Sequence, residues 1–199
     1  MKIGIIGGTF DPPHIGHLVI AEQAYFQLGL DVVWFAPVGQ PPHKTNNRVS
    51  PVKHRIEMTR LSIEGNPHFI LSTADVDRPA PHYITVLFDM LVAQQPDTDW
   101  HLIIGADSLT EMPRWYQPQR LLQLTRLAVA ARVTAQPNMD TLETALPGIG
   151  ARVDWLDCPM IDLASRELQR RVVAGLPIRY MVHEDAGNYI TSHHLYTSQ

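Results

Sequence analysis

Two histidines three residues apart, His14 and His17, end the stretch GGTFDPPHIGH at residues 7–17. The stretch follows the apolar run KIGII at residues 2–6, which is typical of a parallel strand buried on both faces. The two prolines push the residues before them out of the α region, so a helix can begin only near His14. Free N–H groups at the start of a helix, beside a glycine turn, form a site for an anion. Because residues three apart share one face of a helix, both imidazoles should face that anion, and a phosphate is the natural ligand.

The parts of this stretch have simpler interpretations when each is taken alone. A glycine pair often only ends a strand, and a His-x-x-His pair fits a metal site or two solvated side chains. The combination, however, resembles the signature G-x-F-D-P-x-H-x-G-H of the nucleotidyltransferase superfamily, which transfers AMP or CMP from a nucleoside triphosphate. This resemblance implies that His14 and His17 are catalytic. It also implies that both bind ATP, together with Gly7, Gly8, Thr9, Phe10 and Gly16.

Composition and charge narrow the class of protein. The 199 residues fit a single domain, residues 1–199, and a net charge of -4 argues against a general nucleic-acid or membrane surface. Cys158 is the only cysteine, so an internal disulfide is excluded and we expect a cytoplasmic location. No apolar run is long enough to span a bilayer, and Met1 leads into a core strand with no room for a signal peptide.

The apolar periodicity predicts an α/β fold, a Rossmann-like doubly wound parallel sheet with a C-terminal helical cap. Strands are expected at residues 2–6, 31–37, 68–71, 100–104, 126–131 and 152–156. Helices are expected at residues 14–28, 51–63, 84–95, 141–146, 164–174 and 184–192, with a polar loop at 75–83. The sheet core then covers about residues 1–158, and the helical part covers about residues 159–199 of the same domain.

The second predicted helix has clear boundary signals. Ser50 is the expected N-cap and Pro51 the first helical residue. Arg55 is expected to lie off the apolar face of this helix. Because ligands bind beyond the carboxyl ends of such strands, the signature turn and the loop at residues 38–44 should face one crevice.

Further motifs resemble one branch of that superfamily, the bacterial nicotinate-nucleotide adenylyltransferases of NAD synthesis. These motifs are PPHK at residues 41–44, IGADSL at 104–109 and PRWY at 113–116. The resemblance implies transfer of AMP from ATP to nicotinate mononucleotide, giving nicotinate adenine dinucleotide and pyrophosphate, with Mg²⁺ bound mainly through the ATP phosphates. It assigns acceptor binding to His43, Lys44, Tyr83, Thr85, Trp115, Tyr116 and Arg132. It adds Gly105, Asp107, Ser165 and Arg166 to the ATP-binding residues.

Physical arguments support several of these roles and leave alternatives open. Trp115 offers a flat partner for a pyridine ring, although Trp115 and Tyr116 could also be ordinary core aromatics. Asp107 suits a ribose hydroxyl, and it could equally cap a helix. His43 and Lys44 could reach phosphates, or they could be solvated loop residues.

Two segments depart from the pattern of that branch. Its relatives carry I-S-S-T-x-I/L-R near the start of a late helix, where this chain has LASRELQ at residues 163–169, with Gln169 in place of the arginine. Arg166 or Arg170 could supply the missing guanidinium. The second departure is PHYIT at residues 81–85, where relatives usually have P-S-Y-T, and it bears on the identity of the acceptor more than on the reaction class.

Two rival functions therefore stay open. One is adenylyl transfer to another phosphate monoester, such as nicotinamide mononucleotide or phosphopantetheine. The other is a nucleotide-binding module whose turnover is impaired by the altered late helix. The expected partners are ATP and nicotinate mononucleotide, with no nucleic acid and no membrane, and a homo-oligomer is left open.

Overall fold

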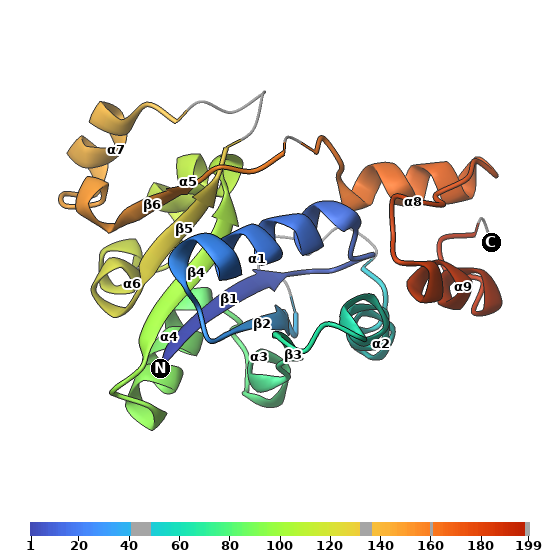
Figure 1. The fold of residues 1–199 in the computed structure, drawn as a ribbon, viewed down its shortest axis with the longest axis horizontal. Coiled ribbons are helices and arrows are strands. Elements are labelled where there is room, and N and C mark those ends of the chain that lie inside the picture. Colours follow the sequence, from blue (N-terminus) through green and yellow to red (C-terminus); the bar gives the residue numbers. More distant parts are fainter. Residues whose placement is uncertain (41–48, 132–136, 160, 198–199) are drawn as a thin grey trace.

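The computed structural model describes residues 1–40, 49–131, 137–159 and 161–197. Within them, six parallel strands form one sheet in the order β3-β2-β1-β4-β5-β6 (Figure 1). The strands are β1 (Lys2–Gly8), β2 (Val32–Pro37), β3 (Phe69–Leu71), β4 (Asp99–Gly105), β5 (Arg126–Ala130) and β6 (Val153–Leu156). The chain winds outward from β1 in both directions, which confirms the predicted doubly wound Rossmann-like sheet.

Helices cover both faces of the sheet. The helices are α1 (Ile15–Leu28), α2 (Val52–Ile63), α3 (Ala74–Asp77), α4 (Ile84–Gln94), α5 (Ala106–Glu111), α6 (Pro118–Leu124), α7 (Met139–Ala145), α8 (Ser165–Val173) and α9 (Glu184–Ser192). Two 3₁₀ turns, η1 (Met112–Arg114) and η2 (Gly150–Arg152), complete the set in the described residues. One core layer joins the sheet to α1 and α2, and the other joins it to α4, α5, α6 and α7.

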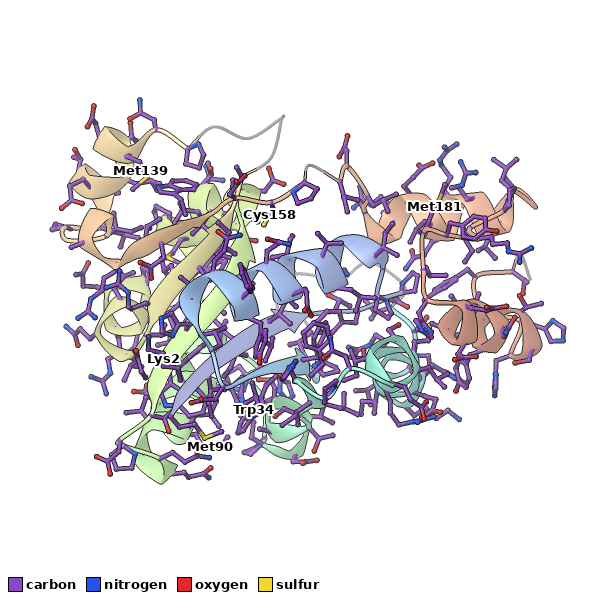
Figure 2. The ribbon with its side chains drawn as sticks, viewed as in Figure 1. Lys2, Trp34, Met90, Met139, Cys158 and Met181 are labelled. Carbon is purple, nitrogen blue, oxygen red and sulfur yellow. The ribbon has the colours of Figure 1, made fainter. Side chains whose placement is uncertain are left out.

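Successive side chains of β1 point to opposite faces of the sheet, which explains why the core has two layers. Ile3 and Ile5 point into the layer of α4, whereas Ile6 points into the layer of α1. Figure 2 labels Trp34 of β2 and Met90 of α4, two partly buried residues at the edge of the core layer between the sheet and α4. Gly4 leaves room for the side chains of Leu30 and Ile103, since a Cβ there would lie 2.7 Å from Leu30 Cδ1 and 2.8 Å from Ile103 Cδ1.

Some predicted boundaries are wrong. The expected loop at residues 75–83 begins within helix α3, and helices α5 and α6 were not predicted. Helix α2 starts at Val52 with Pro51 as its N-cap, one residue later than expected. Arg55, expected off the buried face, is only 2% exposed. The buried face of α2 is instead formed by Arg55, Met58, Thr59, Ser62 and Ile63.

The C-terminal helices lie beyond the carboxyl end of β1 (Figure 1). Helix α9 packs against α2, and the Ile15 N–H at the start of α1 donates to the carbonyl of Met181 at 2.9 Å. The phenol of Tyr196 donates to Asp11 Oδ1 at 2.6 Å. The last segment of the chain therefore contacts the loop between β1 and α1, which we call the signature loop (residues 9–14).

In the described residues, no helix is both long enough and apolar enough to cross a membrane.

The Tyr196 contact gives a stability prediction. Burial raises the pKa of Tyr196 and the Asp11 carboxylate raises it further, so the phenol stays a neutral donor. Tyr196→Phe should lower the free energy of unfolding by about 1.5–3 kcal/mol, because it removes a hydrogen bond to a buried carboxylate. Urea denaturation measures the change. The control is Tyr180→Phe, which should change stability very little because Tyr180 is 78% exposed. Equal losses in both variants would contradict the prediction.

Candidate functional site

The signature loop places both histidines at the start of α1. His14 is the N-cap residue, and its N–H donates to His17 Nδ1 at 3.1 Å. A neutral ring that accepts at Nδ1 carries its hydrogen on Nε2, so His17 is set up as an Nε2–H donor. The two rings lie 3.7 Å apart, and His14 is only 4% exposed whereas His17 is half-buried. Of the two predicted catalytic residues, His17 is therefore the more accessible.

Two neighbours fix the positions of these rings. A Cβ at Gly16 would lie 3.0 Å from His14 Nδ1, so a glycine at this position makes room for the His14 ring. Phe10 packs edge-on against His17, with ring centroids 5.1 Å apart, and it does so from a left-handed backbone with φ of 49°. That conformation is costly for a residue other than glycine, so the surrounding contacts must hold it.

Helix α8 begins beside the same loop. The Ser165 hydroxyl donates to the carbonyl of Pro12 at 2.8 Å, and Gln169 Nε2 donates to the carbonyl of Asp11 at 2.5 Å. The amino-terminal ends of α1 and α8 thus meet at the signature loop, and each brings the positive end of its helix dipole there.

The two arginines that could replace the family arginine differ in their contacts. Arg170 is held by Glu167, with Nη2 2.6 Å from Oε1. Arg166 is exposed on the first turn of α8. Gln169, at the position of the family arginine, contacts loop backbone.

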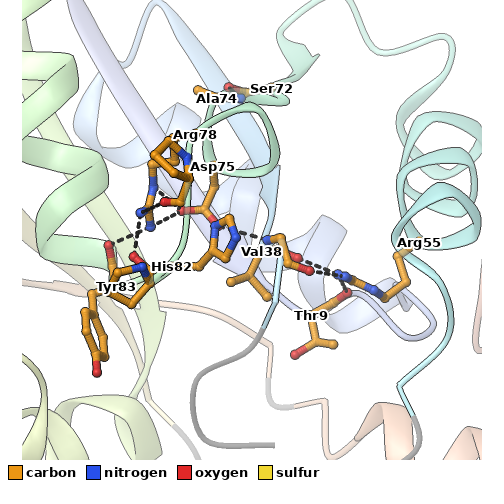
Figure 3. Close-up of polar contacts among 12 residues, drawn as sticks. Thr9, Val38, Arg55, Ser72, Ala74, Asp75, Arg78, His82 and Tyr83 are labelled. Atoms are coloured by element: carbon orange, nitrogen blue, oxygen red, sulfur yellow. Dashed lines mark hydrogen bonds and ion pairs between the residues drawn. The ribbon is translucent and has the colours of Figure 1, made fainter. Parts of the chain in front are cut away.

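Arg55 is a structural residue of the site that the sequence did not reveal. Its guanidinium donates to the carbonyls of Thr9 at 3.0 Å, Val38 at 2.7 Å and Gly39 at 2.7 Å, which joins the signature loop to the loop after β2 (Figure 3). Burial lowers the pKa of Arg55, and the nearby Asp11 carboxylate opposes that change. The spacing of Arg55, Met58 and Ser62 on α2 was the signal that could have indicated its burial.

A pocket of about 330 Å³ lies next to the signature loop, at the carboxyl ends of β1 and β4. Its wall includes six of the predicted site residues, namely Gly7, Gly8, Thr9, Tyr83, Trp115 and Tyr116. Its floor is apolar and includes Leu102 and Ile104 of β4. This is the crevice where the strand order reverses, which is the usual ligand position in such sheets.

An aromatic pair forms one wall of the pocket. Tyr83 and Tyr116 stack with centroids 4.5 Å apart and an interplanar angle of 14°. Thr85 is completely buried, and its hydroxyl donates to the carbonyl of Tyr116 at 2.7 Å, so it lies behind this wall and fixes it. Trp115 both lines the pocket and packs on the core, so the two interpretations of this residue are compatible.

Of the other predicted residues, some lie at the start of α5 and some lie outside the described residues. Gly105 is the N-cap of α5, and Asp107 is exposed on its first turn, so the capping role considered for Asp107 belongs to Gly105. Ser108, which was not predicted, lines the pocket. His43, Lys44 and Arg132 lie outside the described residues.

A Rossmann-like sheet with two helix N-termini at its switch point, beside an aromatic pocket, defines a nucleotide-binding protein with room for a second ligand. Comparisons agree with this class. Residues 5–154 match the family model described as Cytidylyltransferase-like. A protein of Thermomicrobium roseum is 40% identical over 195 residues, with 98% of this chain and 91% of that protein covered. A protein of Roseiflexus sp. is 40% identical over 194 residues, with 98% of this chain and 97% of that protein covered.

Both relatives carry the name "Probable nicotinate-nucleotide adenylyltransferase". Among solved structures, Plasmodium falciparum nicotinic acid mononucleotide adenylyltransferase complexed with NaAD has a TM-score of 0.81 at 15% identity, with 98% of this chain and 97% of that chain covered. That likeness shows the fold. The chain belongs to the cytidylyltransferase-like family and, within it, to the bacterial nicotinate-nucleotide adenylyltransferases.

Proposed function

We propose that this chain transfers the adenylyl group of ATP to the phosphate of nicotinate mononucleotide, giving nicotinate adenine dinucleotide and pyrophosphate in NAD biosynthesis. The observation that carries the proposal is the juxtaposition of an anion site, made by the N-termini of α1 and α8, with an aromatic pocket large enough for a pyridine ring. Full-length similarity to relatives that carry this name supports it.

The reaction needs residues that position the substrates and stabilise developing charge, rather than a residue that abstracts a proton. A phosphate monoester is already largely ionised at neutral pH, because its second pKa is about 6. Its oxygen attacks the α-phosphorus of ATP in line, and pyrophosphate leaves. Charge develops on the phosphoryl oxygens, where a fixed donor is most effective. His17 Nε2–H is that donor in our proposal, and His14 holds His17 in its tautomer.

Mg²⁺ is the expected cofactor and would neutralise charge on the leaving pyrophosphate. In the described residues, no three His, Cys, Asp or Glu side chains gather as a metal site. Because Mg²⁺ favours phosphate and water oxygens over an all-protein cage, the ion would bind mainly through the triphosphate.

The pocket is the proposed site for the acceptor base. Trp115 offers a flat surface for the pyridine ring, and Tyr83 and Tyr116 form an adjoining wall. Ile84, the first residue of α4, also lines the pocket, so the positive end of that helix faces it. A carboxylate on the ring is favoured at such an end.

Several finer assignments remain predictions. Asp107 would bind a ribose hydroxyl, Arg166 the ATP phosphates, and His43, Lys44 and Arg132 the acceptor. Thr85 would act through the position of Tyr116 rather than by touching the acceptor. A cytoplasmic location and the absence of nucleic-acid partners are expected, and the oligomeric state is left to measurement.

An acceptor panel tests the proposed function. Pyrophosphate release is measured with ATP, Mg²⁺ and each of nicotinate mononucleotide, nicotinamide mononucleotide and phosphopantetheine. We expect the highest kcat/KM with nicotinate mononucleotide. The lowest rate with that acceptor would contradict the proposal, and ATP binding without any turnover would favour the impaired binding module.

His17→Ala tests the proposed donor. Removing a fixed donor to a developing charge should lower kcat by roughly a hundredfold or more, while the affinity for ATP falls much less. Steady-state kinetics and calorimetric ATP binding measure the two effects. The control is His68→Ala, a half-buried histidine that stacks on Tyr25 at 4.1 Å. An unchanged rate in His17→Ala would remove His17 from the mechanism.

Arg166→Gln tests which arginine serves the triphosphate. We expect KM for ATP to rise roughly tenfold, because a charge-assisted hydrogen bond contributes about 1.5–3 kcal/mol. The control on the same helix is Arg170→Gln, which should change KM for ATP less than about twofold since Arg170 is already paired with Glu167. The reverse ranking would assign the role to Arg170.

A further inference from the structure

Residues 193–197 follow α9, and they bring one phenol to the signature loop. Tyr196 is half-buried, and its hydroxyl donates to Asp11 Oδ1 at 2.6 Å. The same oxygen lies 3.7 Å from Met58 Sδ on α2. Tyr196 therefore joins the segment after α9 both to α2 and to the loop that leads to His14 and His17.

The backbone on both sides of this hydrogen bond is unusual. Tyr196 has a φ of 62° and His194 a φ of 51°, and on the loop Phe10, the neighbour of Asp11, has a φ of 49°. A left-handed backbone is costly for residues other than glycine, and such residues concentrate at functional sites, where surrounding contacts hold them. This second observation favours a role for the contact beyond stability.

Asp11 connects Tyr196 to His17. Asp11 is only 3% exposed, and its Oδ2 accepts the Ser50 N–H at 2.9 Å, so the carboxylate is held from two sides. Phe10, one residue earlier, packs edge-on against His17 with ring centroids 5.1 Å apart. A displacement of Asp11 would therefore displace Phe10 and the His17 ring that packs against it.

Removing the Tyr196 hydroxyl would take one donor from a carboxylate that has little access to water. A buried carboxylate needs its hydrogen bonds, so Asp11 should move toward another donor or toward solvent. Catalysis by a fixed donor depends on its exact place, and a displacement of about 1 Å can lower a rate about a hundredfold. His17 is the residue whose place is at stake here.

We infer that Tyr196 is a positioning residue for adenylyl transfer, which holds Asp11 and, through Phe10, keeps the His17 ring directed for donation from Nε2. This inference rests on the role of His17 in the proposed function. Tyr196 touches neither substrate and acts only through the signature loop. Its loss therefore lowers kcat and leaves the affinity for ATP nearly unchanged.

The test compares Tyr196→Phe with Tyr189→Phe in the whole chain. For Tyr196→Phe we expect kcat per folded molecule to fall about 5- to 50-fold, with KM for ATP within about threefold, because the loss falls on the transition state. Tyr189→Phe is the matched control, since it also removes a phenol hydrogen bond of the C-terminal part, to His54 Nδ1 at 2.9 Å. Its kcat should stay within about twofold of the wild type. Circular dichroism measures the folded fraction of each variant.

Imidazole nitrogen NMR gives a second readout that does not depend on turnover. In the wild type, His17 should be mainly the Nε2–H tautomer, since its Nδ1 accepts the His14 N–H at 3.1 Å. In Tyr196→Phe, the Nδ1–H tautomer should become populated as the ring leaves that hydrogen bond. Tyr189→Phe should keep the wild-type spectrum. The His17 signals are assigned by their loss in His17→Ala.

The outcomes separate the inference from the proposed function. A kcat for Tyr196→Phe within about twofold of the wild type, or an equal loss in Tyr189→Phe, overturns the inference. A lower kcat with an unchanged His17 spectrum also overturns it, because the effect would then not pass through the signature loop. If Tyr196→Phe does not fold, Asp11→Asn takes its place, and an unchanged kcat and spectrum in that variant overturn the inference. Wild-type protein that adenylates another acceptor, but not nicotinate mononucleotide, would instead contradict the proposed function, and the variants are then compared with that acceptor.

Discussion

The geometry of this site depends on two buried charges, the Asp11 carboxylate and the Arg55 guanidinium. Asp11 receives the Ser50 N–H at 2.9 Å and the Tyr196 phenol at 2.6 Å. Arg55 donates to backbone carbonyls from both loops that follow β1 and β2. Buried backbone carbonyls and buried charges both need hydrogen-bond partners. Here the Arg55 guanidinium and the loop carbonyls supply them to each other. Thr9, Val38 and Gly39 are thereby held at the carboxyl edge of the sheet.

This network explains how segments far apart in the sequence form one anion site. Tyr196, Gln169 and Ser165 all donate to the loop residues Asp11 and Pro12. The C-terminal part of the chain therefore brings the second helix N-terminus to the first. Packing of α9 against α2 holds the same segment from the other side. The left-handed backbone at Phe10 is offset by burial of its ring, which packs against His17 and Phe35.

Local sequence signals predicted the sheet well because most of its strands carry an apolar run, although β6 (Val153–Leu156) includes Asp154. The signature turn and helix α9 (Glu184–Ser192) were likewise readable from spacing and caps. Helices α5 and α6 were missed, since six or seven residues give apolar periodicity fewer than two turns in which to show; α7, also seven residues long, was predicted only as residues 141–146. Arg55 was misjudged because burial of an arginine depends on carbonyls from other segments, which no local pattern reveals. The same reason hid the buried Asp75–Arg78 ion pair, in which Arg78 Nη2 lies 2.6 Å from Asp75 Oδ1.

The central claim is that His17 and the N-termini of α1 and α8 together form the triphosphate site. A crystal structure with a non-hydrolysable ATP analogue and Mg²⁺ tests it most directly. The account predicts the α-phosphate over the first turn of α1, within hydrogen-bond distance of His17 Nε2, and the outer phosphates toward Ser165. A triphosphate bound away from both helix ends, or a His17 ring turned away from it, would contradict the account.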